Sequence, residues 1–119
     1  MAAETKDARM NPPQSKPLEN YGLIGNMISA ALVGADGSID WLCLPRFDSP
    51  ACFASLLGSP ENGRWLVAPA SKEYRSVQRY IQDTAVLETR FDTPTGAVTV
   101  TDFMPLSNDE ERVDVVRMV

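Results

Sequence analysis

The sequence has no histidine among its 119 residues and only two cysteines, Cys43 and Cys52. Without histidine the chain cannot form the Ser-His and Cys-His pairs that activate nucleophiles, or the usual Cys/His zinc site. We therefore expect no metal and no cofactor. Both cysteines are expected to be buried free thiols. Their spacing permits a disulfide, but the reducing cytoplasm disfavours one.

Runs of basic residues and long apolar runs are also missing. The formal net charge is -5, and such a chain repels a phosphate backbone, so nucleic acid is not an expected partner. No apolar run approaches the roughly 20 residues that span a bilayer, and the N-terminus lacks the apolar core of a signal peptide. Glycines occur without phosphate-loop spacing before a helix, which argues against nucleotide binding. We expect no membrane partner and a cytoplasmic location.

The remaining composition is that of one ordinary globular domain, with 44% hydrophobic and 23% charged residues. Residues 1–17 are polar and contain three prolines, which predicts a disordered tail. The pattern changes at Leu18, so residues 18–119 are predicted to form the folded domain. No internal repeat is present.

Short alternating segments predict antiparallel strands. The stretch "YGLIGNMISAALV", the turn at Asp36-Gly37 and "SIDWLCL" predict strand, turn, strand. "RWLVAP" and "EYRSVQRYI" predict two more strands. In "TAVLETRFD", Leu87, Thr89 and Phe91 share one face, and "TPTG" turns the chain into "AVTVTDFMP". Glu88 and Arg90, on the opposite face, suit cross-strand charge pairing.

One short helix is predicted in "SPACFASLLG". Ser49 suits the N-cap, Pro50 the first helical position and Gly58 the C-terminal end. Its apolar residues Phe53, Leu56 and Leu57 have helical spacing, so they are expected to pack on a sheet.

Seven or eight strands with one short helix indicate a mainly β fold, an antiparallel β-sandwich, with a closed barrel of strands as the alternative. The last segment, "RVDVVRMV", alternates like a strand and stops without a turn signal. We therefore expect the domain to be truncated at its C-terminal end. An exposed apolar patch or an open strand edge that promotes association is expected with it.

The stretch from Asp36 to Gly58 mixes acids, an arginine and aromatic rings in a way that resembles a sugar site. Asp40 and Asp48 flank Trp41, Arg46 and Phe47. A glycosidase needs two carboxyl groups on opposite sides of the sugar. The structural interpretation is simpler: Asp40 pairs with a neighbour, Asp48 caps the short helix and Arg46 binds loop carbonyls. Both interpretations stay open for the Arg46-Phe47-Asp48 loop.

Two further features carry weaker signals. Asp102 lies in register with Val98 and Val100, so we expect a structural salt bridge, with Arg90 as the partner. Trp65 and Tyr74 suit either a carbohydrate platform or ordinary packing.

Several ordered motifs resemble a known family. They are "YGLIGNMISAALVGADGSIDWLCLPRFDSPACFASLLG", "ENGRWLVAP", "DTAVLETRF" and "VTDFMP". The segment from Tyr21 to about Val119 resembles the N-terminal domain of bacterial and archaeal glycoside hydrolase family 15 enzymes. That family contains glucoamylase-like glucosidases, glucodextranases and trehalases.

The resemblance implies a β-sandwich ahead of a catalytic (α/α)6 barrel that is absent from this chain. That barrel carries two catalytic glutamates, which hydrolyse alpha-glucosidic bonds with inversion. No catalytic residue is assigned here, and Glu88 belongs to a sandwich strand. The resemblance implies that the "LPRFDSP" loop faces the barrel or the substrate mouth, with Arg46, Phe47, Asp48 and Trp41 as candidate residues.

Two functions from different classes follow. The first is an accessory domain of a glycoside hydrolase that is inactive alone, whose partners are the barrel of the same polypeptide and a glucan or trehalose-type substrate. The second is a stand-alone carbohydrate-binding or protein-interaction sandwich. The choice among trehalose, maltooligosaccharides and dextran lies outside this chain.

Overall fold

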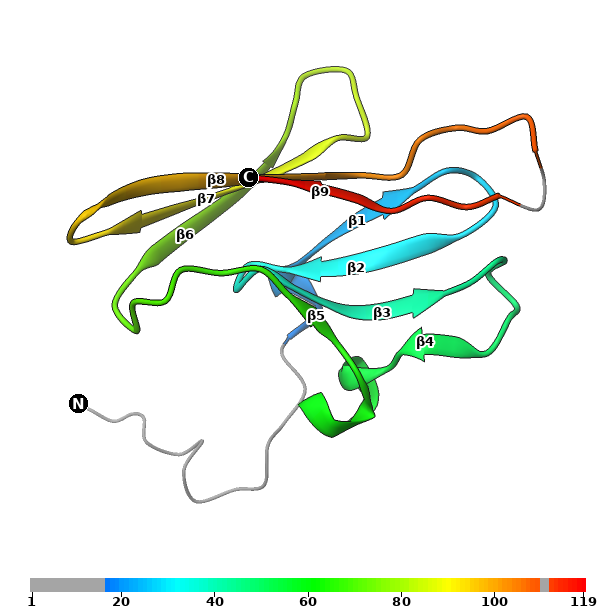
Figure 1. The fold of residues 1–119 in the computed structure, drawn as a ribbon, viewed down its shortest axis with the longest axis horizontal. Helices are drawn as coiled ribbons and strands as arrows, with labels where there is room; N and C mark the ends of the chain where they lie inside the picture. The colour runs from blue at the N-terminus through cyan, green and yellow to red at the C-terminus, as the bar shows by residue number, and fades with distance from the viewer. Residues whose placement is uncertain (1–16, 110–111) are drawn as a thin grey trace.

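A computed structural model describes residues 17–109 and 112–119, and its strands form two antiparallel sheets in two layers (Figure 1). The first sheet has the order β1-β2-β3-β4, with β5 also paired to β3, and the second has the order β6-β7-β8-β9. The mainly β sandwich is therefore confirmed. In the described part of the chain the strands are β1 Tyr21–Gly25, β2 Ala30–Gly34, β3 Ser38–Cys43, β4 Ala51–Phe53, β5 Trp65–Leu66, β6 Arg75–Tyr80, β7 Leu87–Thr93, β8 Gly96–Phe103 and β9 Val116–Met118.

The hairpin of β7 and β8 has the register that the alternation predicts. Leu87 opposes Asp102, Phe91 opposes Val98, and these inward positions are buried or half-buried. Phe91 and Leu87 are among the largest fully buried side chains. The predicted tail, residues 1–17, falls outside the described residues except for Pro17.

The segment predicted as one strand from Tyr21 to Val33 is two strands joined by a tight turn. Asn26 accepts hydrogen bonds at Oδ1 from the backbone N–H groups of Ile28 (3.0 Å) and Ser29 (2.9 Å). Met27 has a φ of 74°, which an asparagine-initiated turn accommodates. The prediction of a continuous strand was wrong because the Asn26 side chain closes the turn locally. The turn at Asp36-Gly37 is confirmed, with Gly37 at a φ of 88°.

The predicted helix from Ser49 to Gly58 is also wrong. Its first half is β4, in which Phe53 opposes Leu42 of β3, and its second half is only the single 3-10 turn Ser55–Leu57. Ser49 does not cap a helix. Its hydroxyl accepts the N–H of Arg46 (3.1 Å). Pairing with β3 satisfies more backbone groups than two isolated helical turns could, so tertiary context overrides the local capping signals. The other two short 3-10 helices are Leu18–Asn20 and Pro60–Asn62.

The core lies between the two sheets, and polar side chains also join them. Most of its buried apolar residues belong to the first sheet, while Leu87 lies on β7 and Met104 directly follows β8. The full set is Ile24, Ala31, Val33, Ile39, Leu42, Leu87 and Met104. From β6, Gln78 donates to the carbonyl oxygens of Val33 (3.2 Å) and Gly34 (3.1 Å) on β2. The layers are therefore fixed by directional bonds as well as by apolar burial.

Candidate functional site

The loop between β3 and β4, residues 44–50, lies at the same end of the molecule as the β1–β2 turn (Figure 1). The N–H of Phe47 donates to the carbonyl of Ile28 in that turn (3.1 Å). Within the loop, the N–H of Ser49 donates to the carbonyl of Arg46 (3.1 Å), and the Ser49 hydroxyl accepts the N–H of Arg46. The backbone of the 44–50 loop is thus held and Leu44 packs against the core, while Arg46, Phe47 and Asp48 are exposed.

Arg46 and Asp48 pair with each other on this loop. The guanidinium Nε lies 3.2 Å from Asp48 Oδ1, and the two side chains are 70% and 77% exposed. An ion pair this exposed contributes little to folding. Asp48 pairs with Arg46 and does not cap a helix as predicted. The Arg46 side chain binds this carboxylate and not the loop carbonyls that were predicted as its partners. Both charges face outward, where a contacting surface could reach them.

Large apolar side chains are exposed near this loop. Phe47 is 61% exposed, and Met27 in the adjacent turn is 87% exposed. Covering one such side chain removes apolar surface from water and stabilises by about 1.5–3 kcal/mol. This end of the sandwich has the composition of a contact surface.

Trp41, the fourth candidate residue, lies on β3 and not on the 44–50 loop. The register places Trp41 opposite Leu32, and Leu32 opposite Leu23. The three side chains are half-buried or exposed, so they form an apolar stripe across the outer face of the first sheet, called the outer stripe below. The sequence-based prediction missed Leu23 and Leu32, because only the strand register reveals that they align with Trp41.

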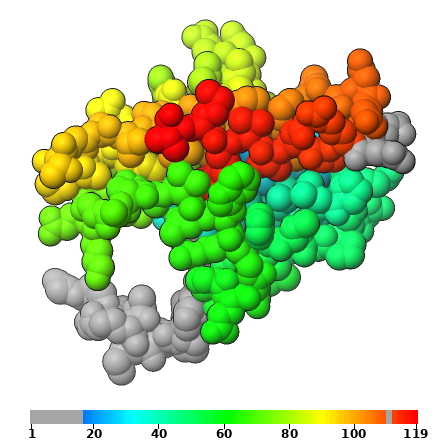
Figure 2. All heavy atoms as spheres, viewed as in Figure 1, coloured from blue at the N-terminus to red at the C-terminus, as the bar shows by residue number. Residues whose placement is uncertain are grey.

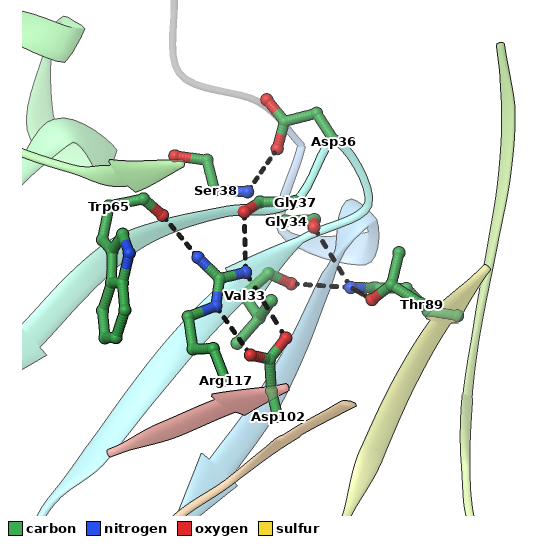
Figure 3. A network of polar contacts seen from close by, with 10 residues as sticks. Val33, Gly34, Asp36, Gly37, Ser38, Trp65, Thr89, Asp102 and Arg117 are labelled. Atoms are coloured by element: carbon green, nitrogen blue, oxygen red, sulfur yellow. Dashed lines mark hydrogen bonds and ion pairs between the residues drawn. The ribbon is translucent and has the colours of Figure 1, made fainter. Parts of the chain in front are cut away.

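The buried acid Asp102 forms a salt bridge with Arg117 of β9. Arg117 Nε lies 2.6 Å from Asp102 Oδ1, and the side chains are 1% and 0% exposed. The same guanidinium donates to the carbonyl of Trp65 on β5 (2.6 Å) and to that of Gly37 in the β2–β3 turn (2.7 Å) (Figure 3). The predicted salt bridge is present, but the predicted partner was wrong. Arg90 is on the outer face, where it pairs with Asp92 at 3.1 Å.

Asp40 is the second buried acid, at 2% exposure. Tyr21 Oη donates to its Oδ2 (2.6 Å) and Ser38 Oγ to its Oδ1 (2.5 Å). Burial and the hydrogen bond to Asp40 raise the pKa of Tyr21 above its ordinary value. Asp40 thus accepts hydrogen bonds from its neighbours, in agreement with the structural interpretation.

The two aromatic residues considered for a sugar platform each have a packing partner. The guanidinium of Arg117 lies over the Trp65 ring at 5.3 Å from its centroid. The rings of Tyr74 and Phe91 meet edge to face with centroids 5.2 Å apart. These contacts favour packing over a platform. On the outer face, Glu88 makes the cross-strand pair that the pattern suggested, with Arg79 of β6 at 2.8 Å.

The remaining chemistry-bearing residues are few. Both cysteines are free as predicted, but Cys52 is exposed and only Cys43 is buried, because Cys52 lies on the edge strand β4. Within residues 17–109 and 112–119, no group of three His, Cys, Asp or Glu side chains gathers as a metal site would require. The helices described in the structure are too short to cross a membrane.

Comparison with known proteins gives the family. The family described as "Trehalase-like, N-terminal" matches residues 4–119. The chain belongs to this family. The predicted resemblance to the N-terminal domain of glycoside hydrolase family 15 enzymes is confirmed by this match.

Several curated relatives of this trehalase-like N-terminal domain are trehalases. Trehalase 2 of Sulfolobus acidocaldarius is 39% identical over 88 residues, 74% of this chain and 15% of that protein. The trehalase of Mycolicibacterium smegmatis is 33% identical over 86 residues, 72% of this chain and 13% of that protein. The trehalase of Mycobacterium tuberculosis is 30% identical over 114 residues, 94% of this chain and 16% of that protein.

The match therefore covers most of this trehalase-like N-terminal domain but only about one seventh of each relative. No solved structure gave a significant match.

Proposed function

We propose that this chain is the N-terminal accessory domain of a glycoside hydrolase that acts on trehalose. Its membership of the trehalase-like N-terminal family carries the proposal, together with trehalase relatives of which it spans about one seventh. Hydrolysis is then performed by a catalytic domain in the remainder of a longer polypeptide, and residues 18–119 support that domain. The resemblance to family 15 enzymes implies a catalytic (α/α)6 barrel that hydrolyses the glucosidic bond with inversion at the anomeric carbon.

The acids of the domain fit a supporting role. A glycosidase needs one protonated and one ionised carboxyl group facing the sugar. Asp40 and Asp102 are buried and bound by Tyr21, Ser38 and Arg117, and Asp48 pairs with Arg46 on an exposed loop. The three acids that the sequence singled out are thus each held by a neighbouring side chain. Structural roles for these three acids fit a domain that supports catalysis performed elsewhere.

The 44–50 loop and the outer stripe are the surfaces we assign to contact with the catalytic domain. Phe47 and the outer stripe supply apolar area, and Arg46 and Asp48 supply charges that a partner surface can bind. An interface of this kind combines an apolar centre with a polar rim. The two free cysteines suit the reducing cytoplasm, where we place the protein.

Substitutions on the 44–50 loop of the longer polypeptide test this assignment. Arg46→Ala and Asp48→Ala are expected to lower trehalose hydrolysis several-fold while shifting the melting temperature by no more than a degree or two, because the pair is exposed. Arg90→Ala and Asp92→Ala are matched controls, since they remove an exposed pair from the other sheet. Unchanged specific activity in both loop variants would overturn the assignment.

Titration of the isolated chain separates this proposal from a stand-alone carbohydrate-binding module. We expect no saturable binding of trehalose or of a glucan to the chain by calorimetry. Saturable binding, with the longer polypeptide lacking hydrolytic activity, would favour the binding module. Assays on maltooligosaccharides and dextran would show whether trehalose is the preferred substrate.

A further inference from the structure

The turn between β1 and β2 is closed by one side chain, that of Asn26. Its Oδ1 accepts the backbone N–H groups of Ile28 (3.0 Å) and Ser29 (2.9 Å), and its own backbone N–H donates to the carbonyl of Ser29 (3.2 Å). Asn26 is only 3% exposed, so little water can compete for these bonds. The conformation of residues 26–29 therefore depends on an acceptor oxygen in the side chain at position 26.

Two hydrogen bonds connect this turn to the 44–50 loop. The carbonyl of Ile28 accepts the N–H of Phe47 (3.1 Å). The Ser29 hydroxyl donates to the carbonyl of Cys43, the last residue of β3. The two residues whose N–H groups bind Asn26 thus also hold the loop, one at its start and one in its middle. In Figure 2 the surface that this loop forms with β3 and β4 (turquoise) lies at the right-hand end of the molecule.

The amide nitrogen of Asn26 takes no part in these bonds. Nδ2 is buried and has no hydrogen-bond partner among residues 17–109 and 112–119. A buried donor without a partner is unfavourable, so this nitrogen does not stabilise the turn. The group that the turn uses at position 26 is the acceptor oxygen, which an aspartate side chain also supplies.

We propose that Asn26 is a positioning residue, which holds the 44–50 loop where Arg46, Phe47 and Asp48 contact the catalytic domain. The proposal rests on the proposed function, which assigns the loop to that contact. Asn26 acts through the backbone of residues 28 and 29 and not by touching the substrate. A shift of about 1 Å in a supporting element can lower activity by up to about 100-fold, so the place of the loop matters to catalysis performed next to it.

Hydrogen exchange in the 119-residue chain tests the link between the turn and the loop. Asn26→Ala removes the acceptor, so exchange at the Phe47 amide is expected to become about tenfold faster or more. Asn26→Asp keeps the acceptor and should return this rate to within about twofold of wild type. Thr84→Ala is the matched control and should leave the rate unchanged. Thr84 closes the β6–β7 connection, in the other sheet, by bonds to the carbonyl of Ile81 (2.7 Å) and the N–H of Val86 (3.1 Å).

Trehalose hydrolysis by the longer polypeptide tests whether the link serves the enzyme. Asn26→Ala is expected to lower kcat/KM several-fold at a temperature at which every variant is folded, while Asn26→Asp and Thr84→Ala keep the wild-type value. Rescue by aspartate distinguishes positioning from a general loss of stability. If Asn26→Ala does not fold, Asn26→Ser takes its place. A hydroxyl closes such turns more weakly, so exchange at Phe47 and kcat/KM should then change in the same direction but by less.

An unchanged Phe47 exchange rate in Asn26→Ala would overturn the proposal, and so would a rate in Asn26→Asp as fast as that in Asn26→Ala. Faster exchange with unchanged kcat/KM would overturn the positioning role, as would an equal loss of kcat/KM in Thr84→Ala. A longer polypeptide of wild-type sequence that does not hydrolyse trehalose would instead contradict the proposed function. The two failures are therefore distinguishable.

Discussion

Arg117 on β9 and Asp102 on β8 are direct cross-strand partners whose side chains form a fully buried ion pair with an Nε to Oδ1 distance of 2.6 Å. The arginine also donates to the carbonyls of Trp65 on β5 and of Gly37 in the β2–β3 turn of the other layer (Figure 3). A charge buried in this way is tolerated only while its partners remain in place. One side chain thus connects the end of the described chain to both layers.

Asp102→Asn is expected to destabilise the domain by about 3–5 kcal/mol, because it leaves the Arg117 guanidinium buried without a countercharge. Urea unfolding followed by circular dichroism measures the loss. Asp92→Asn, which removes the partner of exposed Arg90, is the control and should cost at most about 1 kcal/mol. Equal losses in the two variants would contradict the buried pair. The double variant Asp102→Leu/Arg117→Met should recover part of the stability, because no unpaired charge remains.

The stability of the domain should depend on Tyr21 at alkaline pH. Burial and the bond to Asp40 raise the pKa of Tyr21 in the folded state, so the unfolded chain releases this proton first. The contribution of the Tyr21 hydroxyl is therefore fully present below the unfolded pKa of about 10 and is lost as pH rises beyond it. Unfolding of wild type and Tyr21→Phe, measured from pH 8 to about pH 11, should give a stability difference that shrinks with pH. A difference that stays constant would contradict this assignment.

Tyr80 protects the edge of β1. Its hydroxyl accepts the N–H of Leu23 (2.8 Å) and donates to the carbonyl of the same residue (2.9 Å), so one side chain satisfies both groups in place of a neighbouring strand. Tyr80→Phe is expected to cost about 0.5–1.5 kcal/mol and to speed hydrogen exchange at Leu23. Tyr74→Phe, which keeps the edge-to-face contact with Phe91, should change neither. An unchanged Leu23 exchange rate in Tyr80→Phe would exclude this protection.

Features set by neighbouring residues were predictable from the sequence, and those set by distant ones were not. The β7–β8 hairpin follows from local alternation and a glycine turn. The segment from Ala51 to Phe53 carries helix capping signals, yet it pairs with β3, which no local pattern encodes. Asp102 was expected to be buried and paired. Its partner Arg117 is 15 residues away across a loop, so the identity of the partner depended on the strand order.

The 44–50 loop and the outer stripe, both assigned to contact with the catalytic domain, also differ in whether the sequence predicts them. The 44–50 loop stood out because arginine, phenylalanine and aspartate are adjacent in the sequence. The outer stripe could not be predicted, because Leu23, Leu32 and Trp41 come together only through the registers of three strands.

Hydrolysis of trehalose by the 119-residue chain, measured beside a longer polypeptide that contains it, tests most directly whether this is an accessory domain. Glucose release is the readout, with both proteins at the same molar concentration. We predict no glucose above the buffer control from the chain alone and sustained release from the longer polypeptide. Release of glucose by the isolated chain at a comparable rate would contradict an accessory role.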